Sequence, residues 1–219
     1  MGHYNENNEL EEVTMMNLQD SEGRNVKGLG LAVFAGRLWV FDGRILWYSV
    51  QENVYDFSTS DAEISTSAGF IEFVSDITAI YPYLGTLAVF HKNSSCLISE
   101  DNGVFSKTME SPGGCAGYNS LVFHGTELYF YDNTKKGIFS FREIINGNKT
   151  LGENIAIDIQ AELFRIPLAS VNNVKALSVV TSDRNEVWFL LPDSDTNYSI
   201  ILIYDYIRKA WIKRKSQKI

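Results

Sequence analysis

The stretch from residue 31 to residue 48, LAVFAGRLWVFDGRILWY, holds three short apolar runs separated by two glycine-containing turns. Residues 31–34, 38–41 and 45–48 are rich in Val, Ile, Leu and aromatic side chains, which favour β-strands. Gly36 and Gly43 can adopt the positive φ that tight hairpin turns require. The stretch therefore predicts an antiparallel meander of three strands.

The same pattern occurs four times along the 219-residue chain. In every copy a core of four apolar residues follows a Gly- or Asp-containing turn and precedes another turn and a further strand-like run. A unit copied at this period indicates stacked sheets, since a lone antiparallel sheet of three or four strands cannot bury both faces. The cores, which begin 49, 41 and 59 residues apart, are residues 38–41 (LWVF), 87–90 (LAVF), 128–131 (LYFY) and 187–190 (VWFL).

The composition of these runs indicates how the copies pack. They are apolar almost throughout instead of alternating with polar residues, which is expected when neighbouring sheets cover both faces of a strand. Blades of a β-propeller meet that condition at this period. The sequence therefore predicts an all-β fold, a β-propeller-like array of about four antiparallel blades with one short helical insertion. The expected blades are residues 29–60, 69–101, 115–145 and 174–214.

One segment between the third and fourth blades departs from the β pattern. Ile155, Ile159, Leu163 and Ile166 recur at helical spacing, with charged and amide side chains between them. Pro167 is expected to stop the helix. We therefore predict an amphipathic helical insertion at about residues 155–167.

We predict one large domain, residues 29–214, because no Pro- or Ser-rich linker divides this part of the chain. Residues 1–28 are polar and acidic with strong turn character, typical of an arm that is ordered only when something holds it. Residues 215–219 are a basic tail. No apolar signal segment and no run of 18 apolar residues occurs, so we expect no membrane span and folding in a reducing cytoplasm.

Side chains suited to catalysis or metal binding are few. His3, His91 and His124 fall in the arm and in two different blades, and Cys96 and Cys115 lack further Cys or His residues that would complete a zinc site. No nucleophile elbow, phosphate loop or dinucleotide-binding motif occurs. We expect no catalytic, cofactor-binding or metal-binding residues, and two buried thiols outside any disulfide.

The charge is uneven along the chain. The net charge of −8 argues against a surface that neutralises nucleic-acid phosphates over its whole extent. Six basic residues nevertheless crowd the C-terminal segment, and they belong either to a solvated, frayed terminus or to a docking strand for an acidic partner or a nucleic-acid conduit. These residues are Arg208, Lys209, Lys213, Arg214, Lys215 and Lys218.

Three phrases in a fixed order carry a resemblance to a known family. The first runs from GRLW at residue 36 to YDFS at residue 55, the second begins with PGGC at residue 112, and the third runs from EVWF at residue 186 to AW at residue 210. Together they resemble β-propeller proteins from the tails of short-tailed bacteriophages. The resemblance covers about residues 29–214, and the order of the phrases is more specific than any one of them.

The resemblance implies a structural function. Proteins of this family are nozzle, tail-tubular or head-closure components, arranged as rings below the portal around the genome channel. The expected protein is a virion tail component assembled in the host cytoplasm, with other tail or portal-proximal proteins as partners, in a homo-oligomeric ring and in transient proximity to DNA. Four blades are fewer than the six or so of a closed propeller, so the chain is either a piece of a longer protein or completes its ring by oligomerisation or with strands from a partner.

The sequence leaves two other functions open. A carbohydrate-binding propeller would stack Tyr55, Tyr83 or Tyr118 on sugar rings. A glycoside hydrolase would need two carboxylates at a fixed separation, and no pair can be nominated among the acidic residues. In the tail interpretation, acidic loops such as residues 9–12 and 193–195 would face the lumen and repel phosphates.

Overall fold

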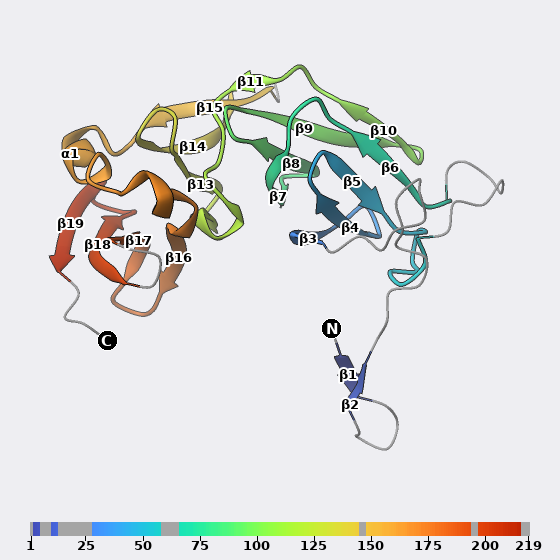
Figure 1. The fold of residues 1–219 in the computed structure, drawn as a ribbon, viewed down its shortest axis with the longest axis horizontal. Helices are drawn as coiled ribbons and strands as arrows, with labels where there is room; N and C mark the ends of the chain where they lie inside the picture. The colour runs from blue at the N-terminus through green and yellow to red at the C-terminus, as the bar shows by residue number, and fades with distance from the viewer. Residues whose placement is uncertain are drawn as a thin grey trace. The chain divides into compact units, whose positions relative to one another are not determined.

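The structure, a computed structural model, describes residues 2–4, 10–12, 28–57, 66–144, 148–193 and 197–215. In this part of the chain the fold is all-β, with four antiparallel meander sheets and one short α-helix (Figure 1). The predicted propeller-like fold class is therefore confirmed. In the arm, a short pair of strands is described, β1 (Gly2–Tyr4) and β2 (Leu10–Glu12).

The first sheet is built around the LWVF core, which lies in its second strand. Ala35 and Gly36, with φ of 51° and 66°, make the tight turn that precedes this strand, and Gly43 makes the next turn with φ of 58°. The predicted hairpin turn at Gly36 is thus confirmed, although Arg37 already belongs to the strand. The strands are β3 (Gly30–Phe34), β4 (Arg37–Asp42), β5 (Ile45–Tyr48) and β6 (Gly69–Glu72).

The second sheet repeats the meander with the same kind of turn. Leu84–Gly85 and Asn102–Gly103 are the two-residue turns, and all four residues have positive φ. The second of these turns lies in residues 99–105, SEDNGVF, which form a hairpin. The strands are β7 (Ile77–Tyr83), β8 (Thr86–His91), β9 (Ser94–Asp101) and β10 (Val104–Lys107), with β11 (Ser111–Pro112) also paired to β9.

The third and fourth sheets follow the same order, and in both the apolar core again forms the second strand. A 3-10 turn, η1 (Tyr118–Ser120), leads into the third sheet. The third sheet contains β12 (Leu121–His124), β13 (Glu127–Asp132), β14 (Gly137–Ile144) and β15 (Asn148–Asn154). The fourth contains β16 (Lys175–Val180), β17 (Asn185–Pro192), β18 (Tyr198–Asp205) and β19 (Ala210–Lys215).

The sheet boundaries differ from the sequence-based ranges at the outer strands. β6 pairs with β5, so residues 69–72 belong to the first sheet and not to the second. β15 pairs with β14, so the third sheet continues past residue 145. The physical reason for the first shift is that β6 is the outermost strand of its sheet. Its side chains stay partly or fully exposed, so it lacks the continuous apolar run that identifies the inner strands.

The helical insertion is confirmed as a short element. It consists of a 3-10 turn, η2 (Ile157–Ile159), followed by α1 (Gln160–Leu163). Leu163 and Ile166 are buried against the sheets, as their spacing predicts. Pro167 ends this element, but it also caps a second 3-10 helix, η3 (Leu168–Asn173), that the sequence pattern did not indicate.

By its internal contacts the chain divides into two compact units, and the division passes through β8 and β9. Met1–Leu87 and Ile98–Lys107 form the first unit, and the rest of the chain forms the second. The second unit holds a large apolar core from the third and fourth sheets and the insertion, while a smaller cluster lies on the first sheet beneath Phe57. In the described part of the chain, no helix has both the length and the hydropathy needed to cross a bilayer.

Candidate assembly surfaces

Side chains alternate between the two faces of each strand, so equivalent positions of the repeat can be compared. Trp39, Ala88 and Tyr129 are the second residues of the first three cores, and their exposed fractions are 0%, 0% and 1%. Each lies on the face turned to the following sheet: the Trp39 ring meets Phe105 of β10 edge-on at 4.8 Å. Trp188 occupies the same position in the last core and is partly exposed.

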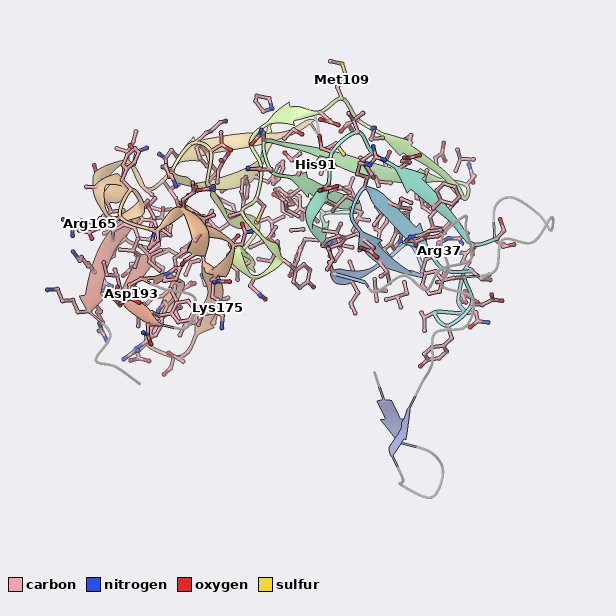
Figure 2. All side chains as sticks on the ribbon, viewed as in Figure 1. Arg37, His91, Met109, Arg165, Lys175 and Asp193 are labelled. Atoms are coloured by element: carbon pink, nitrogen blue, oxygen red, sulfur yellow. The ribbon has the colours of Figure 1, made fainter. Side chains whose placement is uncertain are left out.

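The Trp188 face is the face of the last sheet that carries this tryptophan. The strand register aligns Leu177, Trp188, Ile203 and Ile212 in one row across β16, β17, β18 and β19. Leu177 and Ile212 are 37% and 45% exposed. An adjacent row places two apolar residues between two cations, and its members are Lys175, Leu190, Ile201 and Arg214. Lys175 is labelled on this sheet in Figure 2.

The opposite face of the same sheet is covered. Phe189 and Leu202 are completely buried in the core shared with the third sheet, where Tyr204 lies 6.0 Å from the Tyr129 ring. Trp211 packs 5.0 Å from Tyr204 on this side. The last sheet therefore has one face packed on its neighbour and one apolar face exposed in part, which is unusual for a sheet whose strands are apolar on both sides.

The first sheet has an apolar surface on its opposite side, which the chain itself covers at its centre. We call this the Phe70 face, and its residues lie in strands β3 to β6. Val33 and Phe70 are 60% and 48% exposed, whereas Val40 and Trp47 lie under the segment that contains Phe57. The Phe70 face consists of Leu31, Val33, Leu38, Val40, Asp42, Ile45, Trp47, Phe70 and Glu72.

The C-terminal basic residues do not form one free patch. The Arg208 backbone N–H and guanidinium donate to the Asp205 carboxylate at 2.8 and 2.6 Å, and these bonds lower the pKa of Asp205. The Lys209 ammonium lies 4.0 Å from the centre of the Tyr206 ring. Both cations are thus used to close the turn between β18 and β19.

Strand β19 holds the next group of cations. The Lys213 ammonium donates to Glu162 of α1 at 2.6 Å, and this bond lowers the pKa of Glu162. The Trp211 indole N–H donates to the Ile155 carbonyl at 2.6 Å. Because residues 210–215 form a strand, the frayed-terminus interpretation is wrong for them. Arg214 and Lys215 are exposed, and Lys218 lies outside the described residues.

The first sheet contains a buried cation that the sequence pattern does not indicate. Arg37 is 1% exposed, and its guanidinium donates to the carbonyls of Ser49 and Ser67 at 2.6 and 2.7 Å. The same group lies over the Tyr48 and Phe105 rings, at 5.3 and 5.6 Å from their centres. Burial lowers the pKa of Arg37. The GR dipeptide predicts a turn, but nothing in it indicates that the arginine is buried.

A histidine at the end of β12 bonds to two polar side chains of the last sheet. His124 is 2% exposed, its Nδ1 lies 2.7 Å from the Ser178 hydroxyl, and its Nε2 bonds to the Asn185 side-chain oxygen. A serine and a third polar side chain bonded to the two nitrogens of a histidine are also found in hydrolase triads. Here both partners come from the neighbouring sheet, so we interpret the arrangement as a clamp between β12 and strands β16 and β17.

The other predicted residues are placed as follows. Tyr55 and Tyr118 are 42% and 39% exposed. Tyr83, the last residue of β7, faces the core and is only 1% exposed. The expectation that Tyr83 stacks on a sugar ring is therefore wrong. Asp193 is exposed, while Glu9 and Asp195 lie outside the described residues. Among the residues described, no three His, Cys, Asp or Glu side chains gather where they could hold a metal.

The two cysteines lie where the sequence predicts. Cys96 and Cys115 are both buried, and neither forms a disulfide. Burial raises the pKa of the Cys115 thiol to about 11. At neutral pH this thiol is protonated and poorly nucleophilic, so it has the properties of a packing residue.

Comparisons with known proteins add information about the fold. No family model and no curated protein sequence matches the chain. The N-terminal domain of Nup159, a β-propeller, matches with a TM-score of 0.52 and 12% identity over 89% of this chain and 48% of that structure. An S. cerevisiae complex of Dbp5 with Nup159, Gle1, IP6 and ADP matches at 11% identity, 89% and 48% coverage and a TM-score of 0.48. The chain spans about half the length of the structures it matches.

Proposed function

We propose that this chain is a structural protein of a bacteriophage tail, a nozzle or head-closure component that works by protein–protein assembly around the genome channel and not by catalysis. The observation that carries the proposal is the Trp188 face, whose equivalents in the other three sheets are covered. A partly exposed apolar face on a packed sheet is typical of proteins that function within an assembly. The three sequence segments that resemble tail propellers support the phage tail as the assembly in which the chain functions.

The proposed location is the virion tail, assembled in the host cytoplasm, with other tail or portal-proximal proteins and further copies of the chain as neighbours. The exposed cations of β19, Arg214 and Lys215, are candidates for docking an acidic partner. The net charge of −8 is suited to a channel wall that does not hold DNA phosphates.

The test follows an epitope-tagged copy of the chain in cells that produce the phage particles encoding it. The tag is expected to remain with the particles through a density gradient and a high-salt wash, and immunogold is expected to label the tail. A tag that stays entirely in the soluble fraction would refute the proposal. The carbohydrate-binding alternative depends on Tyr55 or Tyr118, and glycan-array binding that either Tyr→Ala change abolishes would support it instead.

A further inference from the structure

We infer that the Trp188 face binds the Trp188 face of a second copy of this chain, so that the last sheets of two copies pack on each other about a twofold axis. The inference deepens the proposed function by naming a partner, and it rests on that function only for its biological setting. The contact is isologous, because both copies use the same surface. It involves only the fourth sheet, which lies wholly within the second compact unit.

The Trp188 face consists of three rows of side chains. The middle row is apolar, with Trp188 in an inner strand and Ile212 in the outermost one. The row on one side of it ends in the cations Lys175 and Arg214. The row on the other side contains two acids, and its members are Val179, Glu186, Asp205 and Ala210. The face is therefore apolar in the middle, basic along one side and acidic along the other.

A surface with this order of charges is complementary to itself. Two copies of the face can stack about a twofold axis that runs either along the middle row or along the strands. An axis along the middle row places each strand over its own equivalent and the basic row of one copy over the acidic row of the other. An axis along the strands places the basic row over the basic row, so like charges meet. The charges therefore favour the axis along the middle row.

Lys175 and Glu186 form the most specific pair in this arrangement. Lys175 is exposed in β16, and Glu186 is partly exposed in the adjacent strand β17. When each strand lies over its equivalent, Lys175 of one copy comes within one strand spacing, about 5 Å sideways, of Glu186 of the other. Glu186 already accepts from the Trp188 indole at 2.7 Å, and a carboxylate can accept further hydrogen bonds. The twofold axis makes this pair twice.

The second charge pair is weaker. Arg214 is exposed in β19 and comes near Asp205 of the other copy in the same way. Asp205 is only 8% exposed and is held by Arg208 of its own chain. Arg214 is therefore expected to contribute less than Lys175.

The middle row supplies the apolar part of the contact. Trp188 lies over its own counterpart, and the 37% and 45% exposed side chains of Leu177 and Ile212 cover each other at the two ends of the row. Four strands and three rows span about 19 Å by 17 Å, or roughly 300 Å² per copy. This is less than half of the about 800 Å² per partner of a standard interface, so we expect a dissociation constant on the order of 100 μM.

The first experiment measures the mass of the purified full chain by light scattering between about 1 μM and 1 mM. The wild type is expected to pass from monomer to dimer. Ile212→Glu is expected to raise the dissociation constant at least tenfold, because the twofold axis brings two buried carboxylates together. Ile157→Glu is the matched control and should leave association unchanged, since Ile157 is 68% exposed and lies in the insertion, outside the fourth sheet. Circular dichroism shows whether each variant is folded.

Cross-linking of single-cysteine variants tests the direction of the axis. Leu177→Cys and Ile212→Cys are each expected to cross-link to their own kind with a bismaleimide of about 10 Å reach, the spacing of stacked sheets. Cys96 and Cys115 are buried, and the wild type is the control for their reactivity. An axis along the strands would bring Leu177 opposite Ile212, so cross-links that form only when the two variants are mixed would overturn the proposed axis.

A charge exchange tests the specific pair. Lys175→Glu and Glu186→Lys are each expected to weaken association of their own kind about two- to fivefold, because like charges then meet twice. A mixture of the two variants restores both opposite-charge pairs, so heterodimers are expected to form at least as readily as wild-type dimers. Heterodimers no stronger than the variant homodimers would overturn the pairing of these residues.

The outcomes separate this inference from the proposed function. A wild-type chain that is monomeric at the highest concentration overturns the second-copy contact, even if the tagged chain is found in tails. Dimers that respond to the variants as described support the contact, even if the chain is absent from particles.

Discussion

Trp39 and Trp188 stand at the same position of the repeat, in the first and the last sheet, yet their surroundings differ. Trp39 is completely buried, lies 4.9 Å from the Tyr48 ring and 4.8 Å from the Phe105 ring, and donates its indole N–H to the Phe34 carbonyl. Trp188 is partly exposed and bonds to Glu186 of its own strand. The comparison shows that the repeat specifies a sheet with two apolar faces, whether or not the chain itself covers both.

The largest expected effect comes from truncating these two residues. Trp39→Ala should lower the free energy of unfolding by about 3–5 kcal/mol, because it leaves a cavity between packed sheets. Trp188→Ala in the monomeric chain should cost about 1 kcal/mol, since less apolar area is removed from contact. Urea denaturation at low protein concentration measures both values, and equal losses would contradict the comparison.

The buried cation beside Trp39 gives the next effect. Arg37→Met should lower the free energy of unfolding by roughly 2–3 kcal/mol, because the carbonyls of Ser49 and Ser67 lose a charged donor in a buried site. Arg44→Met, an exposed change in the same sheet, serves as the control and should cost less than about 0.5 kcal/mol. A loss at Arg37 no larger than at Arg44 would mean that the guanidinium does not hold the sheet.

The clamp between the third and fourth sheets should have an intermediate effect. His124→Phe removes both hydrogen bonds to Ser178 and Asn185 and should cost about 1–2 kcal/mol. Ser178→Ala removes only one of them and should cost about half as much. Denaturant midpoints of the two variants decide this, and a neutral His124→Phe would argue against a clamp.

The smallest effect is the acid dependence of the edge strand. The pKa of Asp205 is lowered by its bonds to Arg208, so the stability it contributes is present above its unfolded pKa and is lost as the pH falls through the lowered folded value. Asp205→Asn should therefore reduce the fall in thermal midpoint below about pH 4. If the variant and wild type lose stability in parallel on acidification, Asp205 has no such role.

The inner strands of each sheet could be predicted from the sequence, because each is a continuous apolar run bounded by turn residues. The outer strands could not. β6 and β10 are short and half-exposed, and their pairing depends on the neighbouring strand and not on their own pattern. For this reason the sequence pattern places residues 69–72 in the second sheet, whereas they pair with β5 of the first.

The candidate surfaces show the same limit. Strand alternation predicts that Trp188 and Ile212 lie in apolar rows, but only the structure shows that Trp188 is partly exposed and Ile212 exposed. The sequence also grouped six basic residues, whereas the structure pairs Arg208 and Lys213 with acids of the same chain. A cluster of charged residues in the sequence shows the composition of a segment. Which residue each charge pairs with depends on the fold.

The most direct test of the central claim is hydroxyl-radical footprinting of the tagged chain, both free and in purified particles, read by mass spectrometry. Trp188 and Ile212 are expected to be protected in the particles compared with the free chain. Equal oxidation of Trp188 and Ile212 in the free and the particle-bound chain would contradict the claim that the Trp188 face is an assembly surface.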